Sequence, residues 1–192
     1  MNKTRKNRNT HNKTKKRVFS KKHYESGDGM MTKIWGAAMW HYLHTMSFNY
    51  PVHPSENDKK KYMEFIKNLE YVLPCKYCRI NLKKNFEILP LTKEVMKYRH
   101  TFSKYVYELH EHINTMLGKK SNLTYEKVRE IYEHFRARCT KPTRKEKGCV
   151  KPMYGEKSKC ILRVVPQVKK TKSFDVDKKC LKRLTKRRKT IQ

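Results

Sequence analysis

The sequence has no apolar stretch long enough to cross a bilayer. A crossing needs about 18–20 consecutive apolar residues, and no apolar segment of a secretory signal follows the basic N-terminus. We therefore expect a cytosolic or nucleocytoplasmic protein with no membrane partner. Structural disulfides do not normally persist in these compartments. The six cysteines therefore favour metal or redox chemistry over structural disulfides.

Acidic residues are also scarce, with 17 Asp and Glu against 48 Lys and Arg and a formal net charge of +31. Residues 1–27 contain 10 basic residues against one Glu, and residues 140–192 contain 19 against four acids. We expect a core domain at 28–139 between a disordered basic N-terminal extension (1–27) and a basic, cysteine-containing C-terminal extension (140–192). The extensions could bind nucleic acid or an acidic partner, although a solvated tail explains the N-terminal run more simply.

No strand pattern of useful length precedes residue 160, and the periodicity of the core predicts helices. Apolar periodicity predicts them at 34–50, 59–73, 75–89, 102–117 and 125–139. The predicted N-caps are Ser55, Thr101 or Ser103, and Thr124, with Gly118 as a C-cap. The one β-like run, 160–168, is interrupted by Pro166. The pattern predicts an all-α bundle of four or five helices.

Cys75 and Cys78 form the only Cys-x-x-Cys pair in the chain. Zinc needs about four ligands, and the other cysteines stand alone. A zinc site built from this pair, Cys139 and one histidine stays open as an alternative. A thioredoxin-type site would require a βαβ unit, which the helical pattern does not offer.

The remaining interpretation is a redox disulfide at the start of a helix, where the helix dipole and free N–H groups stabilise a thiolate. Such a pair takes two electrons from a dithiol by exchange. Protein side chains offer no acceptor for those electrons, so a cofactor is implied, most simply a flavin. Trp40, His44 and His110 are suitable lining residues, although each alone is more simply explained as a packed core side chain.

Three segments, in this order and spacing, resemble the FAD-linked sulfhydryl oxidases of the ERV/ALR family. They are "WGAAMWHYLHTMSFNYP" (35–51), "LPCKYCRINL" (73–82) and "LHEHINTMLGK" (109–119). The signature "YEHFRARC" and the basic tail look most like the versions encoded by large cytoplasmic DNA viruses. The resemblance implies a viral protein in the host cytoplasm (viral factory) and in the virion.

The resemblance also implies a four-helix bundle with a short fifth helix, which binds FAD and forms a homodimer. Cys75 would exchange with the thiols of dithiol-containing substrate proteins, and Cys78 would face the flavin. Molecular oxygen would take the electrons and leave as hydrogen peroxide, with no metal involved. The implied cofactor-binding residues are Gly36, Trp40, His44, Tyr50, Cys78, His110, Asn114, Leu117, Lys119 and Tyr132.

The sequence departs from the family pattern at three positions. Ala37 stands where many members have Arg, and Glu111 replaces an Asn. Tyr125 lies near the place of a structural cysteine, so Cys139 lacks that partner. The tail cysteines fit either a shuttle disulfide or a structural or metal-stabilised tail: Cys139, Cys149, Cys160 and Cys180. The competing function is a basic zinc- or nucleic-acid-binding virion protein.

Overall fold

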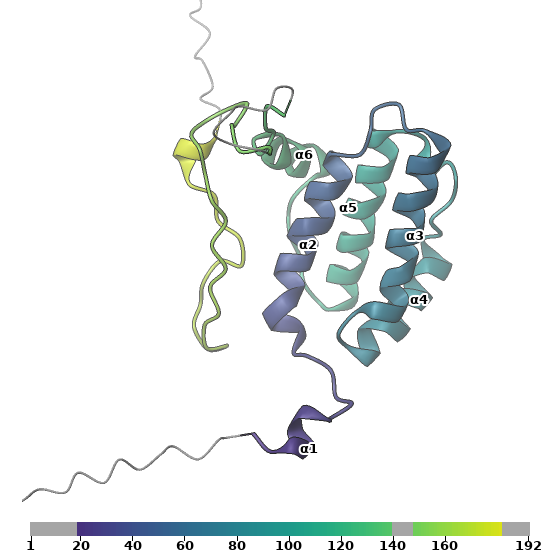
Figure 1. Ribbon diagram of the computed structural model, residues 1–192, viewed down its shortest axis with the longest axis vertical. Coiled ribbons are helices and arrows are strands. Elements are labelled where there is room, and N and C mark those ends of the chain that lie inside the picture. The colour runs from purple at the N-terminus through teal and green to yellow at the C-terminus, as the bar shows by residue number, and fades with distance from the viewer. Residues whose placement is uncertain (1–18, 140–147, 182–192) are drawn as a thin grey trace, which may run out of the picture.

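The computed structural model describes residues 19–139 and 148–181 of the chain (Figure 1). Its described parts contain helices and a single isolated β-bridge but no strand, so the all-α prediction is confirmed. The four long helices are α2 (Thr32–Phe48), α3 (Glu56–Val72), α4 (Lys76–Ile88) and α5 (Arg99–Met116). The shorter ones are α1 (Lys21–Tyr24), α6 (Tyr125–Glu133) and the 3-10 turns η1 (Val95–Lys97) and η2 (Lys178–Cys180).

One apolar core joins the four long helices. α2 lies along α5 and α3 lies along α4, while α6 crosses the end of α2 (Figure 1). Leu43, Ile66, Leu82 and Val106 come from the four helices in turn and are all buried in the same cluster. Burying each such side chain stabilises the fold by about 1.5–3 kcal/mol, and this cluster fixes the positions of the helix ends that carry the site.

The sequence placed two of the helix starts correctly. Ser55 caps α3, where its hydroxyl accepts from the Asp58 N–H at 3.1 Å and its own N–H donates to the Asp58 carboxylate at 2.9 Å. Thr124 caps α6 by accepting from the Lys127 N–H at 3.3 Å. Both are side-chain caps of the kind expected for Ser and Thr, because they satisfy N–H groups that the first helical turn leaves free.

The predicted start of α5 at Thr101 or Ser103 was wrong. The helix begins at Arg99 with Tyr98 as its N-cap. Thr101 lies inside the first turn, where its hydroxyl accepts from the Tyr98 N–H at 3.1 Å. Ser103 is buried and donates to the Arg99 carbonyl at 2.7 Å. Ser and Thr hydroxyls can bond to the backbone one turn earlier as well as cap a helix. The position of a Ser or Thr in the sequence therefore does not identify the N-cap by itself.

α6 ends at Glu133, six residues before the predicted boundary, because the chain turns back on itself. The Arg138 N–H donates to the Lys151 carbonyl at 2.8 Å and the Met153 N–H to the Arg136 carbonyl at 2.7 Å. These bonds flank the bridge between Ala137 and Pro152. The β-like run at 160–168 forms no strand.

The extensions contain little regular structure where they are described. α1 lies within the N-terminal segment that we expected to be disordered, and residues 1–18 lie outside the described ranges. The C-terminal extension runs along the side of α2 that faces away from α3 (Figure 1, green to yellow). None of the described helices is both long and apolar enough to span a membrane.

Candidate active site

Cys75 and Cys78 form a disulfide at the start of α4. Cys75 is the N-cap of this helix, and its Sγ accepts a hydrogen bond from the Cys78 N–H at 3.2 Å. Cys78 is the third helical residue. Both sulfurs therefore lie within the positive end of the helix dipole, where a thiolate is stabilised. The predicted helix start at the cysteine pair is confirmed.

The turn that carries Cys75 is held by hydrogen bonds to its backbone carbonyls from two sides. The Arg79 guanidinium donates to the Leu73 carbonyl, and the Met30 N–H donates to the Pro74 carbonyl at 2.7 Å. Gly29 lies so close that a Cβ there would stand 2.8 Å from the Pro74 oxygen and 3.1 Å from the Cys75 Cα. Only glycine fits this approach, so the segment before α2 rests directly on the cysteine turn.

Four of the sequence-predicted cofactor residues meet in a row of aromatic rings. The Trp40 and His110 rings stack with centroids 4.0 Å apart and an interplanar angle of 7°. His44 Nε2 lies 2.9 Å from His110 Nδ1, and the centroid of the His44 ring is 5.3 Å from that of Tyr132. The rings come from α2, α5 and α6, so the fold brings together residues that lie up to 92 positions apart.

Burial keeps both histidines of this row neutral. It lowers the pKa of His44 to about 3, helped by the charges of His110 and His41. It also lowers the pKa of His110 to about 4, where Glu111 opposes the shift and Lys119 adds to it. Neutral imidazoles can donate through one nitrogen and accept through the other. His44 Nδ1 is buried and has no hydrogen-bond partner, so it can serve a bound polar group.

Glu111, one of the departures from the family pattern, organises the end of α5. Its carboxylate accepts from the Asn114 side-chain amide at 3.0 Å and from the Ser121 hydroxyl at 2.8 Å. The Lys119 N–H donates to the Asn114 carbonyl at 2.8 Å, across the left-handed Gly118 with φ 66°. Asn114 and Lys119 are thereby held together beside the His110 end of the ring row, and Leu117 is exposed next to them.

The structure does not bring the remaining predicted residues to the ring row in the same way. Tyr50 is fully buried in the core against Phe102, and its hydroxyl donates to the Met96 carbonyl at 2.8 Å. Gly36 lies one turn before Trp40 on α2, where a Cβ would meet only Thr32, at 3.8 Å. Packing within the chain therefore gives no reason for glycine at this position.

These residues fit a planar aromatic cofactor. The row offers ring faces, neutral histidines and one unpartnered buried nitrogen, and Lys119 supplies positive charge for an anionic group. Leu82, one turn after Cys78, belongs to the same apolar cluster as Leu43, and Trp40 packs against this cluster. The face of α4 that carries Cys78 is therefore turned toward the core that holds the rings.

The tail cysteines form one disulfide, between Cys139 and Cys149. Cys160 is free and exposed, and Cys180 is free and partly buried. Because Cys139 is bonded to Cys149, the zinc site of Cys75, Cys78 and Cys139 is not assembled. Within residues 19–139 and 148–181, no group of three or more His, Cys, Asp or Glu side chains could hold a metal ion.

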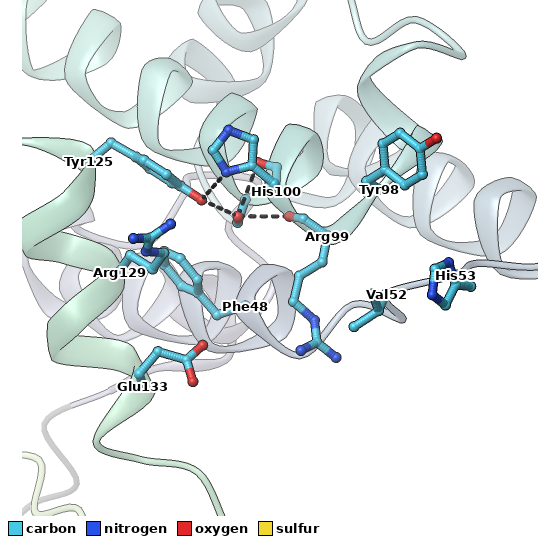
Figure 2. Close-up of a pocket in the computed structure, with 10 residues that line it drawn as sticks. Phe48, Val52, His53, Tyr98, Arg99, His100, Tyr125, Arg129 and Glu133 are labelled. Carbon is cyan, nitrogen blue, oxygen red and sulfur yellow. Dashed lines mark hydrogen bonds between the residues drawn. The ribbon is translucent and has the colours of Figure 1, made fainter.

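Hydrogen bonds position α6, and with it Tyr132. The Tyr125 hydroxyl lies 2.8 Å from Ser103 Oγ and 3.3 Å from His100 Nδ1 (Figure 2). Arg136 donates to the Phe48 carbonyl at 2.8 Å and pairs with Glu133. These contacts surround an open cavity of about 370 Å³ between α2, α5 and α6. Tyr125, found where a cysteine was expected, thus anchors α6 without a covalent bond.

Three residues of the ring cluster were missed from sequence, and one of them is Phe48, which stacks on Tyr132 with centroids 5.4 Å apart. His41 Nδ1 lies 3.3 Å from the Tyr132 hydroxyl, and Phe174 of the C-terminal extension lies with its ring centroid 5.0 Å from that of His41. His41 directly follows Trp40 and shares a helix with His44, so it could have been found. Phe174 stands in a segment without periodicity and carried no signal.

Comparison with known proteins places this arrangement in a family. The model of the Erv1/Alr family matches residues 37–136. The chain is 38% identical over 104 residues to a protein of Acanthamoeba polyphaga mimivirus named "probable FAD-linked sulfhydryl oxidase", a match that covers 54% of this chain and 72% of that protein. It is 32% identical over 84 residues to the FAD-linked sulfhydryl oxidase ERV1 of Arabidopsis thaliana, covering 44% of this chain and 42% of that one.

A structural likeness accompanies these matches. The crystal structure of the yeast Erv1 core aligns with a TM-score of 0.49 at 18% identity, over 63% of this chain and 95% of that one. Membership rests on the sequence matches, which span the cysteine pair and the ring row together. The chain belongs to the Erv1/Alr family.

Proposed function

We propose that this protein is an FAD-dependent sulfhydryl oxidase that forms disulfide bonds in substrate proteins. Electrons would pass from substrate thiols to Cys75 and Cys78, then to FAD and to oxygen, which leaves as hydrogen peroxide. The observation that carries the proposal is the Cys75–Cys78 disulfide at the start of α4, in a core that also gathers Trp40, His44 and His110. The names of the viral and plant relatives support the same activity.

The cysteine pair accounts for the thiol half of the reaction. A substrate thiolate attacks Cys75 Sγ, the bond to Cys78 breaks, and Cys78 leaves as a thiolate. This leaving group is stabilised by the start of α4 and by the charge of Lys76. A second substrate thiol then resolves the mixed disulfide. The substrate has lost two electrons and two protons, and the pair has become a dithiol.

FAD, when bound, supplies the acceptor that takes these two electrons and passes them to oxygen. The Trp40 ring and His44 Nδ1 would hold its ring system, and Cys78 would face it. His110, Asn114, Leu117 and Lys119 would hold its adenine and phosphate side, and Tyr132 would stack on the adenine. Gly36 stays a proposed contact, whereas Tyr50 would act through the core that supports the helices.

A visible absorption spectrum tests the proposal directly. The purified full chain should be yellow, with flavin absorbance, and should consume oxygen in the presence of a dithiol. It should release one hydrogen peroxide for each disulfide formed, because each transfer moves two electrons. Protein that stays colourless and inactive after incubation with FAD would overturn the proposal.

The assembly that we propose is a homodimer formed through the outer faces of α2 and α3. An apolar cavity of about 420 Å³ lies there, lined by Trp35, Tyr42, Val72 and neighbouring residues. Tyr42 is 53% exposed and its ring packs edge-on against Phe65. Exposed aromatic patches of this kind are typical of protein–protein contacts. Sedimentation of Tyr42→Asp should give a monomer where the parent protein gives a dimer.

We propose 28–139 as the oxidase unit, with the basic extensions as a tether to nucleic acid or to an acidic partner. The net charge of +31 supports this role. The host cytoplasm or the virion is the proposed location, supported by the mimivirus relative. Zinc binding without flavin would instead favour the alternative of a basic zinc- or nucleic-acid-binding virion protein.

A further inference from the structure

Phe174 is the residue of the C-terminal extension that touches the core domain at the ring row. Its ring lies parallel to Tyr132, with centroids 6.5 Å apart and an interplanar angle of 12°. It also lies 5.0 Å from the His41 ring and edge-on to Phe135 at 6.2 Å. The matched family region ends at residue 136, so Phe174 lies outside it.

The contact extends an existing row rather than forming a separate cluster. Rings follow one another from Trp40 through His110 and His44 to Tyr132, with neighbouring centroids 4.0–5.3 Å apart. Phe174 adds a further ring parallel to Tyr132, which also stacks with Phe48 at 5.4 Å. Aromatic pairs in such parallel or edge-on arrangements are favourable beyond the area that they bury, so Phe174 restricts the positions open to Tyr132.

A disulfide and backbone hydrogen bonds hold the extension on both sides of Phe174. These bonds fix the position of Phe174. At its start, the Cys139–Cys149 disulfide and the bond from the Met153 N–H to the Arg136 carbonyl hold it against the end of α6. At its end, the Glu156 N–H donates to the Lys179 carbonyl at 3.1 Å. Gly155 makes this closure possible, because a Cβ there would collide with the Cys180 backbone. Phe174 lies within the loop so formed.

Three apolar residues of the same loop are more exposed than Phe174. Val168 is 91% exposed, and Ile161 and Leu162 are each 68% exposed, whereas Phe174 is 42% exposed. Phe174 is covered through its ring contacts with His41, Tyr132 and Phe135.

We infer that Phe174 is a positioning residue for the cofactor: it packs beside His41 and Tyr132, restricts Tyr132, and slows the release of bound FAD. The inference rests on the proposed function, in which Tyr132 stacks on the adenine. Without Phe174, Tyr132 keeps Phe48, stacked at 5.4 Å, and Phe135, edge-on at 5.6 Å, but loses the parallel ring that the extension contributes. Because an aromatic pair contributes up to about 1.5 kcal/mol, its removal should speed FAD release and weaken FAD binding by up to about tenfold.

The test compares Phe174→Ala with Phe174→Tyr and with the matched control Val168→Ala, all in the full chain. FAD release into excess apo-flavoprotein acceptor gives the dissociation rate, and flavin fluorescence titration gives the Kd. We expect faster release and weaker binding for Phe174→Ala alone, with Phe174→Tyr restored to the parent values. Equal release from Phe174→Ala and Val168→Ala would overturn the inference.

Thermal melts with and without FAD separate a cofactor role from a packing role. We expect the gain in Tm that saturating FAD gives the parent protein to shrink in Phe174→Ala and to stay unchanged in Val168→Ala. A fall in Tm that is equal with and without FAD would reduce Phe174 to a packing residue and overturn the inference. A parent protein that binds no FAD would refute the proposed function itself, which is a different result.

Discussion

The two disulfides of this chain stand in opposite environments. Cys75 and Cys78 are partly buried and lie at the start of α4, whereas Cys139 and Cys149 are exposed and lie between α6 and the extension. Access to solvent therefore does not mark the reactive pair. The difference is the helix: only the first pair has a helix start to stabilise the thiolate that must leave when the bond is attacked.

Replacing Cys78 should have the largest effect of any change to the two disulfides. Cys78→Ser leaves Cys75 without a partner, so no disulfide remains for the substrate to attack, and oxygen uptake with a dithiol should fall to the uncatalysed background. Oxygen-electrode rates on FAD-loaded protein measure this. Cys149→Ser is the matched control, because it breaks the other disulfide and should keep most of the activity.

A large loss of activity in Cys149→Ser would change the role assigned to the second disulfide. If Cys149→Ser lost as much activity as Cys78→Ser, with its flavin still bound, the exposed pair would be an electron shuttle and not a clamp. Free Cys160 and Cys180 would then be the next positions to test, since Cys180 lies beside the closure of the extension.

Lowering the pH should destabilise the bundle around the first disulfide without affecting the second, because a disulfide does not titrate. The pKa of His44 is lowered to about 3 and that of His110 to about 4 by burial. As pH falls below about 6.5, His44 and His110 bind protons in the unfolded chain but stay neutral in the folded chain. Stability is therefore fully present above this pH and is lost as pH falls toward 4.

The expected loss between pH 7 and pH 5 is about 2 kcal/mol for each of the two histidines. Urea unfolding of the FAD-free protein, followed by Trp fluorescence, measures it. His53→Asn is the control, since His53 is exposed and lies outside the ring row. A stability that stays flat from pH 7 to pH 5 would contradict the assignment of both buried histidines as neutral.

Removing the second disulfide should cost less. Cys139→Ser combined with Cys149→Ser frees a loop whose ends lie 10 positions apart. Disulfides that close loops of this size typically contribute about 2–4 kcal/mol, here to the docking of the extension. Limited proteolysis should cut the double variant faster within residues 148–181, while α2 to α5 stay resistant. Equal cleavage of the variant and the parent would show that the backbone bonds suffice.

The same contrast explains what the sequence could predict. The bundle was predictable because its helices carry local periodicity. Trp40, His44, His110 and Tyr132 were assigned to the cofactor because their segments resemble the ERV/ALR family. The start of α5 was misjudged because Thr101 is the third helical residue, where it accepts from the N–H of the N-cap Tyr98, and Ser103 donates to the Arg99 carbonyl inside the helix.

The extension was not predictable for a physical reason. Four tail cysteines allow three pairings, and spacing does not choose among them. The contact of Phe174 with Tyr132 joins residues 42 positions apart in sequence through a loop closed by backbone bonds. Such contacts depend on where the chain turns, and no periodic pattern encodes that.

The smallest expected effect concerns the end of α6 that has no disulfide. Tyr125 is buried, and its hydroxyl lies 2.8 Å from the Ser103 hydroxyl and 3.3 Å from His100. Tyr125→Phe keeps the ring and removes the hydroxyl, which should cost about 1 kcal/mol because Ser103 loses a buried partner. Tyr107→Phe is the matched control, since its hydroxyl bonds the Leu123 carbonyl at an exposed site.

Urea unfolding of the two variants measures this difference. Tyr125→Phe should be the less stable of the two, because an exposed hydroxyl group is replaced by water at little cost while a buried one is not. If both variants matched the parent, ring packing of Tyr125 against Phe48 would hold α6 without the hydrogen bonds. The start of α6 would then be held by apolar packing, and not by the hydrogen bonds of the Tyr125 hydroxyl that the distances indicate.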